Sequence, residues 1–249
     1  LFIVQQLKSP FPLVDIHLFW NNKVFAFSNL AALINYSATF VINFLLSLYL
    51  QNIKLLTSAE AGSILVAAPV MQAFISPFAG KLSDRFEPQI IASIGMAITV
   101  IGLVLLIFLN GSTSIDYILF CLILLGIGFA LFSSPNVNAT MSSVNNKYYG
   151  VASATLGTMR LTGQMFSMGI TMLVFAVILG NHPISEANHQ LFLKSNKLIF
   201  SILSVICCGG IFASLARGKM HPAPAGGRFL KYRKPSASTG GGTTDNSNH

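Results

Sequence analysis

Charged side chains are scarce in this sequence: 15 Lys or Arg and seven Asp or Glu among 249 residues, or 9% of the chain. Soluble globular domains carry about 25% charged residues, and disordered chains are poor in apolar residues. With 53% hydrophobic residues and a mean hydropathy of +0.68, the chain fits neither class. The composition predicts a helical protein that crosses a membrane several times.

Residues suited to catalysis or metal binding are also few, and their positions argue against an enzyme. The cysteines Cys121, Cys207 and Cys208 fall inside apolar runs, where they suit packing and form no metal-ligand or disulfide pattern. No paired carboxylates occur within those runs, and all five histidines lie outside them: His17, His182, His189, His221 and His249. We therefore expect no catalytic residue, no metal ion and no bound cofactor. Because the basic residues adjoin an apolar body, nucleic acid is not an expected partner.

What the sequence does contain is six long apolar runs. Each holds about 20 residues or more, enough for a helix rising 1.5 Å per residue to cross a hydrocarbon core about 30 Å thick. The runs cover residues 27–50, 61–80, 89–109, 117–140, 155–180 and 198–216. Arg160 is the one formal charge inside them. We predict an all-α membrane fold in which residues 26–216 form a bundle of six transmembrane helices.

Lys and Arg are distributed unequally between the two sides of this bundle. The side of the first connector receives eleven: Lys8, Lys23, Lys81, Arg85, Lys147, Arg217, Lys219, Arg228, Lys231, Arg233 and Lys234. The other side receives three, namely Lys54, Lys194 and Lys197. Because cytoplasmic loops are enriched in Lys and Arg, we expect both ends of the chain in the cytoplasm and the bundle in the cytoplasmic membrane.

The segments that flank the bundle are more polar. Residues 8–23 suit either a short interfacial helix, with Trp20 among the lipid headgroups, or a plain linker. Residues 1–4 look like the end of an earlier apolar segment, so we expect a fragment in which residues 1–25 form a cytoplasmic connector. Residues 217–249 are rich in Pro, Gly, Ser and Thr and predict a basic, disordered cytoplasmic tail.

The most informative polar segment connects the second and third runs and reads Gly-Lys-Leu-Ser-Asp-Arg-Phe over residues 80–86. Gly80 permits close helix approach, and Asp84 suits the positive N-terminal end of a neighbouring helix. One interpretation is a cytoplasmic gate loop formed by Gly80, Leu82, Asp84 and Arg85. The other is a short basic loop that only obeys the positive-inside rule.

This segment resembles the G-x-L-(A/S)-D-R signature of the major facilitator superfamily, found between the second and third helices of a six-helix half. Residues 134–136 (Ser-Pro-Asn) and 160–164 (Arg-Leu-Thr-Gly-Gln) are similar to the fourth and fifth helices in the second half of fourteen-helix drug:proton antiporters. The resemblance covers about residues 10–216 and implies the C-terminal half of such a transporter. It implies proton-coupled efflux of drugs or other small amphipathic molecules by alternating access, with a proton gradient as energy source. The partner of Asp84 would then lie in the other half.

Polar residues recur every three or four positions along the first, second, fourth and fifth runs, as expected if those faces line a cavity. In the superfamily the same four helices of each half line the cavity. Alternatively, these side chains serve close packing, as we expect for Gly157 and Gly163, or bond across helices. The residues that we expect to line a substrate cavity are Asn35, Tyr36, Asn43, Gln72, Asn136, Arg160 and Gln164.

Arg160 has the highest cost among these residues, because a central Arg costs roughly 2.5–3.5 kcal/mol on membrane-insertion scales. It either binds an anionic group of the substrate, pairs with a carboxylate of the other half, or balances a proton-coupled acid. A fourth interpretation is that it snorkels toward the cytoplasmic end, about two turns away. No Asp or Glu lies within the six runs, so a proton-carrying carboxylate would belong to the other half.

Three classes of function compete for this pattern. A half of a secondary transporter would have as partners a small-molecule substrate, the lipid bilayer and the missing N-terminal half of the same chain. The second class is a complete six-helix transporter or channel acting as a homodimer. A facilitator-type transporter of a non-drug metabolite is an alternative within the transporter class. A selectivity filter or charged pore ring, which a channel requires, is not recognisable. The third class, an intramembrane enzyme, lacks its catalytic groups.

Overall fold

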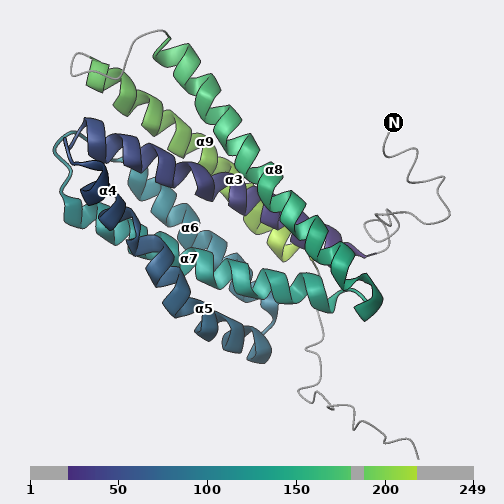
Figure 1. Cartoon of the computed structure of the whole chain (residues 1–249). Coiled ribbons are helices and arrows are strands. Elements are labelled where there is room, and N and C mark those ends of the chain that lie inside the picture. Colours follow the sequence, from purple (N-terminus) through teal and green to yellow (C-terminus); the bar gives the residue numbers. More distant parts are fainter. Residues whose placement is uncertain (1–21, 181–187, 218–249) are drawn as a thin grey trace, which may run out of the picture.

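The computed structural model describes residues 22–180 and 188–217, and every regular element in these ranges is a helix (Figure 1). The elements are α3 (Lys23–Asn52), α4 (Ser58–Leu65), α5 (Ala67–Arg85), α6 (Pro88–Ile107), α7 (Ile115–Ser142), the short η1 (Asn146–Tyr148), α8 (Tyr149–Ile178) and α9 (His189–Leu215). With α4 and α5 counted as one span, six segments are long and apolar enough to cross a membrane, which confirms the predicted fold. Most of the predicted connector and tail, residues 1–21 and 218–249, lies outside the described residues.

Polar side chains fix where several helices begin. The Asn22 side chain accepts a hydrogen bond from the Phe25 N–H at 3.0 Å, which caps α3. Thr57 and Glu60 form a reciprocal capping box at the start of α4, and Ser114 caps α7. Because these caps lie outside the apolar runs, the helices are longer than hydropathy alone predicts.

The start of α9 differs most from prediction, since the helix begins at His189 instead of residue 198. Its first turns are amphipathic, with Lys194 and Lys197 exposed on one face. The buried face consists of Phe192, Ser195, Asn196 and Ile199. The prediction that the two lysines lie in a loop was wrong, because a segment chosen by mean hydropathy excludes helical turns that carry charge on one side.

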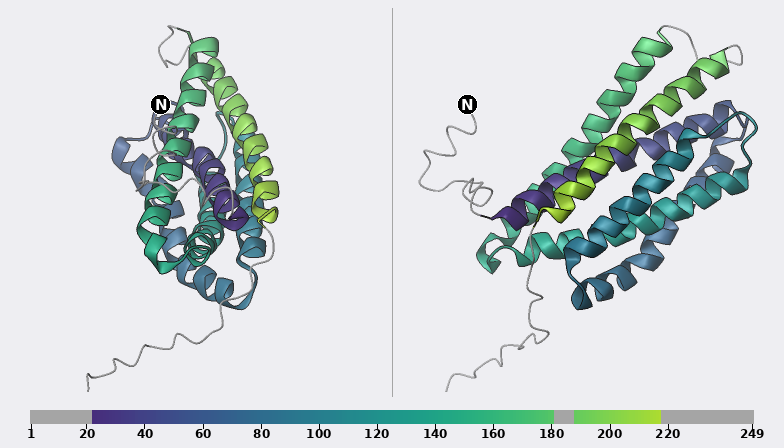
Figure 2. Two further views of the ribbon diagram at one scale, coloured as in Figure 1. Left: turned by 90° about the vertical axis from the view of Figure 1, so that its right-hand side faces the viewer. Right: turned by 180° about the vertical axis from the view of Figure 1, so that it is seen from behind.

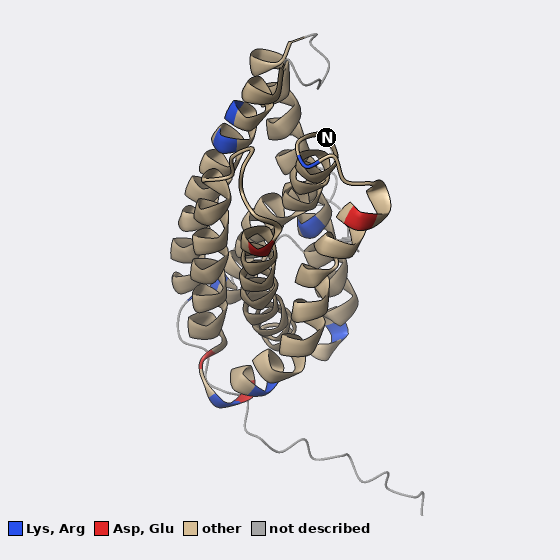
Figure 3. Cartoon of the chain, turned by 90° about the vertical axis from the view of Figure 1, so that its left-hand side faces the viewer, with Lys and Arg blue, Asp and Glu red and all other residues tan. Residues whose placement is uncertain are grey.

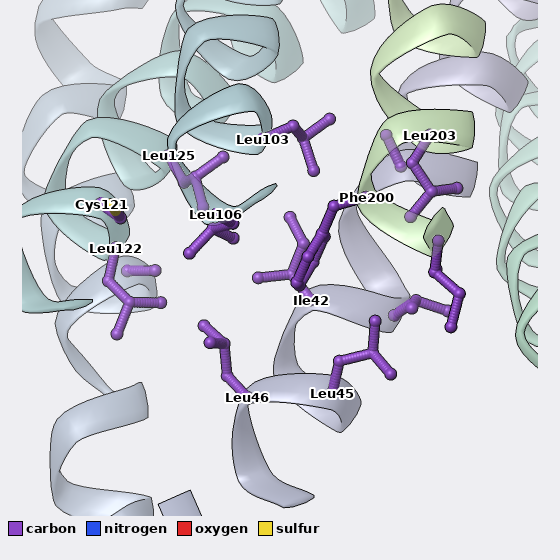
Figure 4. Close-up of a cluster of buried hydrophobic side chains, with 14 of the residues drawn as sticks. Ile42, Leu45, Leu46, Leu103, Leu106, Cys121, Leu122, Leu125, Phe200 and Leu203 are labelled. Atoms are coloured by element: carbon purple, nitrogen blue, oxygen red, sulfur yellow. The ribbon is translucent and has the colours of Figure 1, made fainter. Parts of the chain in front are cut away.

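The core lies between α3, α6, α7 and α9, as Figure 4 shows. Its buried side chains include Ile42 and Leu46 of α3, Leu106 of α6, Leu125 of α7 and Phe200 of α9. Lipid tails are as apolar as these side chains, so close packing contributes more to helix association in a membrane than burial from water does. Gly126 shows how close the packing is: a Cβ there would stand 2.5 Å from the Ala68 carbonyl oxygen on α5.

Helices α5 and α8 lie on opposite flanks of the bundle and are its least covered members (Figures 1 and 2). Only Ala68, Ala79 and Ser83 are buried in α5. Large apolar side chains stand exposed on both helices, among them Phe74, Phe78, Met165, Leu173 and Val177. Apolar surface of this extent suits contact with lipid or with another apolar protein surface.

Charged residues occupy little of the bundle (Figure 3). We call the end formed by the start of α3, the α5–α6 turn, the α7–α8 turn and the end of α9 the basic end. Its described basic residues are Lys23, Lys81, Arg85, Lys147 and Arg217. The opposite end carries Lys54, Lys194 and Lys197 together with Glu60 and Asp116.

Candidate functional site

One polar face of α3 is directed toward α7. Seven residues make nearly two helical turns, so Asn22, Asn29, Tyr36 and Asn43 share a face. The Asn22 amide donates to the Ser143 carbonyl oxygen at 2.5 Å, and the Tyr36 Oη lies 3.4 Å from the Ser133 Oγ. These two contacts show that α3 and α7 run antiparallel with their polar faces together.

Arg160 of α8 joins this face at Tyr36. The guanidinium Cζ lies 4.5 Å from the centroid of the Tyr36 ring, within the range of a cation–π interaction. Arg160 is eleven residues into α8, and Tyr36 thirteen residues into α3. At 1.5 Å per residue the contact lies roughly 17–20 Å from the basic end, near the middle of a core about 30 Å thick. The structure therefore holds the guanidinium at mid-span and not at a helix end.

Asn43 and Gln72 meet in a second polar position, nearer the opposite end. They line a small cavity of about 50 Å³ between α3, α5 and α7, together with Thr39, Pro69 and Phe129. Such a volume has room for a few water molecules and is far below the 300 Å³ or more that a drug-sized ligand requires. A site for such a ligand would need a surface facing this one.

The remaining predicted cavity residues lie apart from these two positions. Asn35 is 2% exposed and shares a face of α3 with the core residue Ile42, and within the described bundle its Nδ2 has no hydrogen-bond partner. Asn136 is equally buried, on the face of α7 that carries Ser133, and its Oδ1 likewise has no partner among the described residues. Gln164 is half-buried on α8. The structure thus brings Tyr36 into contact with Arg160 and places Asn43 and Gln72 on one small cavity, but it does not gather all seven residues around one cavity.

The predicted gate loop is helical. Helix α5 continues through Gly80, Leu82 and Asp84 to Arg85, and only Phe86 and Glu87 separate it from α6. The expectation of a loop was wrong because Gly80 does not end the helix. It lets α5 pack on α7 instead, where a Cβ would come within 3.3 Å of the Ser134 Oγ.

This helix end still presents an open, largely apolar surface that carries charged side chains. An open groove of about 500 Å³ runs along it, lined by Lys81, Leu82, Asp84 and Arg85 with Phe78 and Leu131. The Asp84 side chain is exposed. Among the described residues its carboxylate makes no ion pair, so it is available to a partner outside the described bundle.

Arg217 is a feature that the sequence analysis missed. It is 1% exposed, and none of its three guanidinium nitrogens has a hydrogen-bond partner among the described residues. Burial lowers the pKa of Arg217 to about 10. One turn earlier, the Ser93 Oγ donates to the Ser214 Oγ at 2.9 Å, which places the end of α9 against the start of α6. A basic residue after an apolar run gives no sequence signal for burial.

Comparison with known proteins decides the family. The family model of the Major Facilitator Superfamily matches residues 28–232. The chain belongs to the Major Facilitator Superfamily. Its six spans form one half of the superfamily's bundle, as predicted from the residue 80–86 segment. Members of the Major Facilitator Superfamily are transporters and not enzymes.

Three relatives within the superfamily are similar along most of this chain. The riboflavin transporter RibZ of Clostridioides difficile is 24% identical over 86% of the chain and 47% of its own length. The transporter YebQ of Escherichia coli is 31% identical over 70% of the chain and 38% of its length. The lincomycin resistance protein LmrB of Listeria innocua is 28% identical over 64% of the chain and 34% of its length. The chain therefore spans half or less of each of these relatives.

Proposed function

We propose that the chain forms one half of a secondary transporter that exports small amphipathic molecules, drugs among them, by alternating access. The observation that carries this proposal is a polar position near mid-span, where the Arg160 guanidinium lies on the Tyr36 ring and the Tyr36 Oη lies 3.4 Å from the Ser133 Oγ. Transporters bind substrate near the midplane, between two such units. The names of relatives support a small-molecule substrate, since LmrB is a lincomycin resistance protein and RibZ a riboflavin transporter.

The facing surface would be a second six-helix unit, which we place against the exposed faces of α5 and α8. These helices are the least covered ones in the described bundle; α8 packs on α3, and α5 shares a small cavity with the polar face of α3. Asp84 at the end of α5 would pair with that second unit when the basic end closes. A second copy of this chain is the alternative occupant, and cross-linking between copies through α5 or α8 would favour it.

The energy source in this proposal is a proton gradient, with no bound cofactor or metal. Among the described residues no Asp or Glu lies at mid-span, so the proton-carrying carboxylate would belong to the second unit. The basic end would face the cytoplasm of a cell whose cytoplasmic membrane holds the protein, because basic residues are enriched on that side.

Dye accumulation in cells tests the function. Cells that produce this chain together with the second six-helix unit should accumulate less of at least one of two xanthene dyes, the anion fluorescein or the cation rhodamine 6G, than cells without them. A protonophore should abolish the difference. Equal accumulation of both dyes with and without the protein would contradict transport, and a difference that persists in the protonophore would contradict proton coupling.

A further inference from the structure

The charges inside the described membrane spans are of one sign at mid-depth. Arg160 is the only ionisable Asp, Glu, Lys or Arg there within residues 22–180 and 188–217. The others lie closer to the two ends, the deepest of them being Lys197, eight residues into α9. The acidic ones are Glu60, Asp84, Glu87 and Asp116, all at helix ends or turns. The wall that this half contributes to a central cavity is therefore positively charged.

The contact with Tyr36 positions this charge without neutralising it. A cation–π interaction uses the ring face and contributes about 0.5–2 kcal/mol, less than the roughly 2.5–3.5 kcal/mol cost of a central Arg. Unlike a hydrogen bond to an oxygen atom, the cation–π contact uses none of the N–H donors of the guanidinium. Within the described residues Arg160 makes no hydrogen bond or ion pair, so its five N–H donors remain available.

The site also offers hydroxyl groups beside the guanidinium. The Tyr36 Oη and the Ser133 Oγ lie 3.4 Å apart, and the same ring carries the Arg160 contact. A guanidinium binds carboxylate, phosphate or sulfonate oxygens in a two-pronged geometry, and hydroxyls add donors to the remaining oxygens. A cationic ligand would meet like charge in a medium of low dielectric constant.

We infer that Arg160, held on Tyr36, recognises an anionic group of the substrate, so that the transported class is small amphipathic anions. The inference rests on the proposed function, because it assigns the substrate class of that same cavity. The competing arrangement is a carboxylate of a second unit that pairs permanently with Arg160, which would leave no preference for anions.

Binding of the two xanthene dyes to the protein in nanodiscs, with the second six-helix unit present, distinguishes these arrangements. At pH 8 we expect fluorescein, a dianion, to bind at least tenfold tighter than rhodamine 6G by fluorescence anisotropy, with empty nanodiscs as background. R160Q should weaken fluorescein binding about tenfold and leave rhodamine 6G binding unchanged or tighter. K197Q, which removes an exposed charge from α9, is the matched control and should alter neither affinity.

Where R160Q fails to fold, a conservative variant of Arg160 and two variants of Tyr36 test the same inference. R160K and Y36L should each weaken fluorescein binding, because the first loses the two-pronged geometry and the second loses the ring. Y36F, which keeps the ring, should stay within about threefold of the wild type. Equal or tighter binding of rhodamine 6G to the wild type, unchanged fluorescein binding in R160Q or R160K, or no saturable fluorescein binding would each overturn the inference.

The results of the binding and export experiments distinguish a failure of the anion-site inference from a failure of the proposed transport. Arg160-dependent fluorescein binding without any change in cellular dye accumulation would contradict the proposed transport and leave the anion site intact. Proton-dependent export of rhodamine 6G that is indifferent to R160Q would support transport and contradict the anion site.

Discussion

Ser93 and Ser214 join α6 to α9 through a buried hydrogen bond of 2.9 Å between their hydroxyls. One turn beyond Ser214, the guanidinium of Arg217 is buried and has no hydrogen-bond partner among the described residues. A buried charge without partners costs free energy that packing elsewhere has to offset. The end of α9 thus combines a satisfied buried polar pair with an unsatisfied buried charge.

Replacing Arg217 by Met should therefore stabilise the protein. Because the folded-state pKa of about 10 lies well below the ordinary value of an arginine, the charged form disfavours folding, and the full penalty is present at pH 8. The shift corresponds to on the order of 3 kcal/mol. We expect R217M to raise the melting temperature in detergent by several degrees, whereas R217K, which keeps a charge, should not.

The pH dependence provides the check on this explanation. Between pH 10 and 12.5 the unfolded state binds more protons at Arg217 than the folded state does, so this residue's contribution to stability rises with pH in that window. The difference in melting temperature between R217M and wild type should shrink as the pH approaches 10 and passes it. A melting temperature for R217M equal to or below that of wild type at pH 8 would count against the buried-charge account.

A Gly→Ala substitution should have different effects at two positions on α8. A Cβ on Gly163 would collide with the Leu33 carbonyl oxygen of α3, whereas at Gly157 nothing lies within 4 Å. The expected packing role therefore holds for Gly163 and was wrong for Gly157 within the described bundle. G163A should destabilise the protein by about 1–3 kcal/mol, and G157A should leave it unchanged or slightly more stable. Thermal unfolding followed by size-exclusion chromatography measures both.

The sequence predicts the spans and the family more completely than the contacts between helices. Apolar run length identifies six helices, and the residue 80–86 segment identifies the superfamily, because both are local properties. That Tyr36 and Arg160 meet depends on the crossing of α3 and α8, which neither helix encodes alone. Helical periodicity assigns both residues to the cavity side but carries no information about which side chains pair.

The wrong predictions for Asn35 and Arg217 also arise because the packing between helices cannot be deduced from one helix alone. Asn35 is adjacent in sequence to Tyr36, yet one residue turns a helix by about 100°, which places Asn35 in the core. Arg217 looks like a solvent-exposed residue that follows a span, and its burial is visible only in the folded structure. The sequence of a helix therefore predicts which of its residues share a face, but it does not predict which residues of other helices they contact.

The orientation of the bundle predicts a labelling pattern. In a background with its three cysteines replaced, K147C would lie at the basic end and S112C at the opposite end, and both positions are exposed. A maleimide that cannot cross membranes should label S112C in intact cells, and K147C only after permeabilisation. The reverse pattern would place the basic end outside the cell.

Asp84 provides the sharpest test of the helix end at residues 80–85. Its exposed carboxylate makes no ion pair among the described residues and lines an open groove, as a group that pairs with a second unit would. D84N should lower dye export at least tenfold with unchanged protein in the membrane, because the amide loses the charge that holds the closed state. D116N, at the opposite end in the first turn of α7, is the control and should export normally. Full export by D84N would contradict a gating role for residues 80–85. Their remaining role would be to orient the protein in the membrane, for which Lys81 and Arg85 suffice.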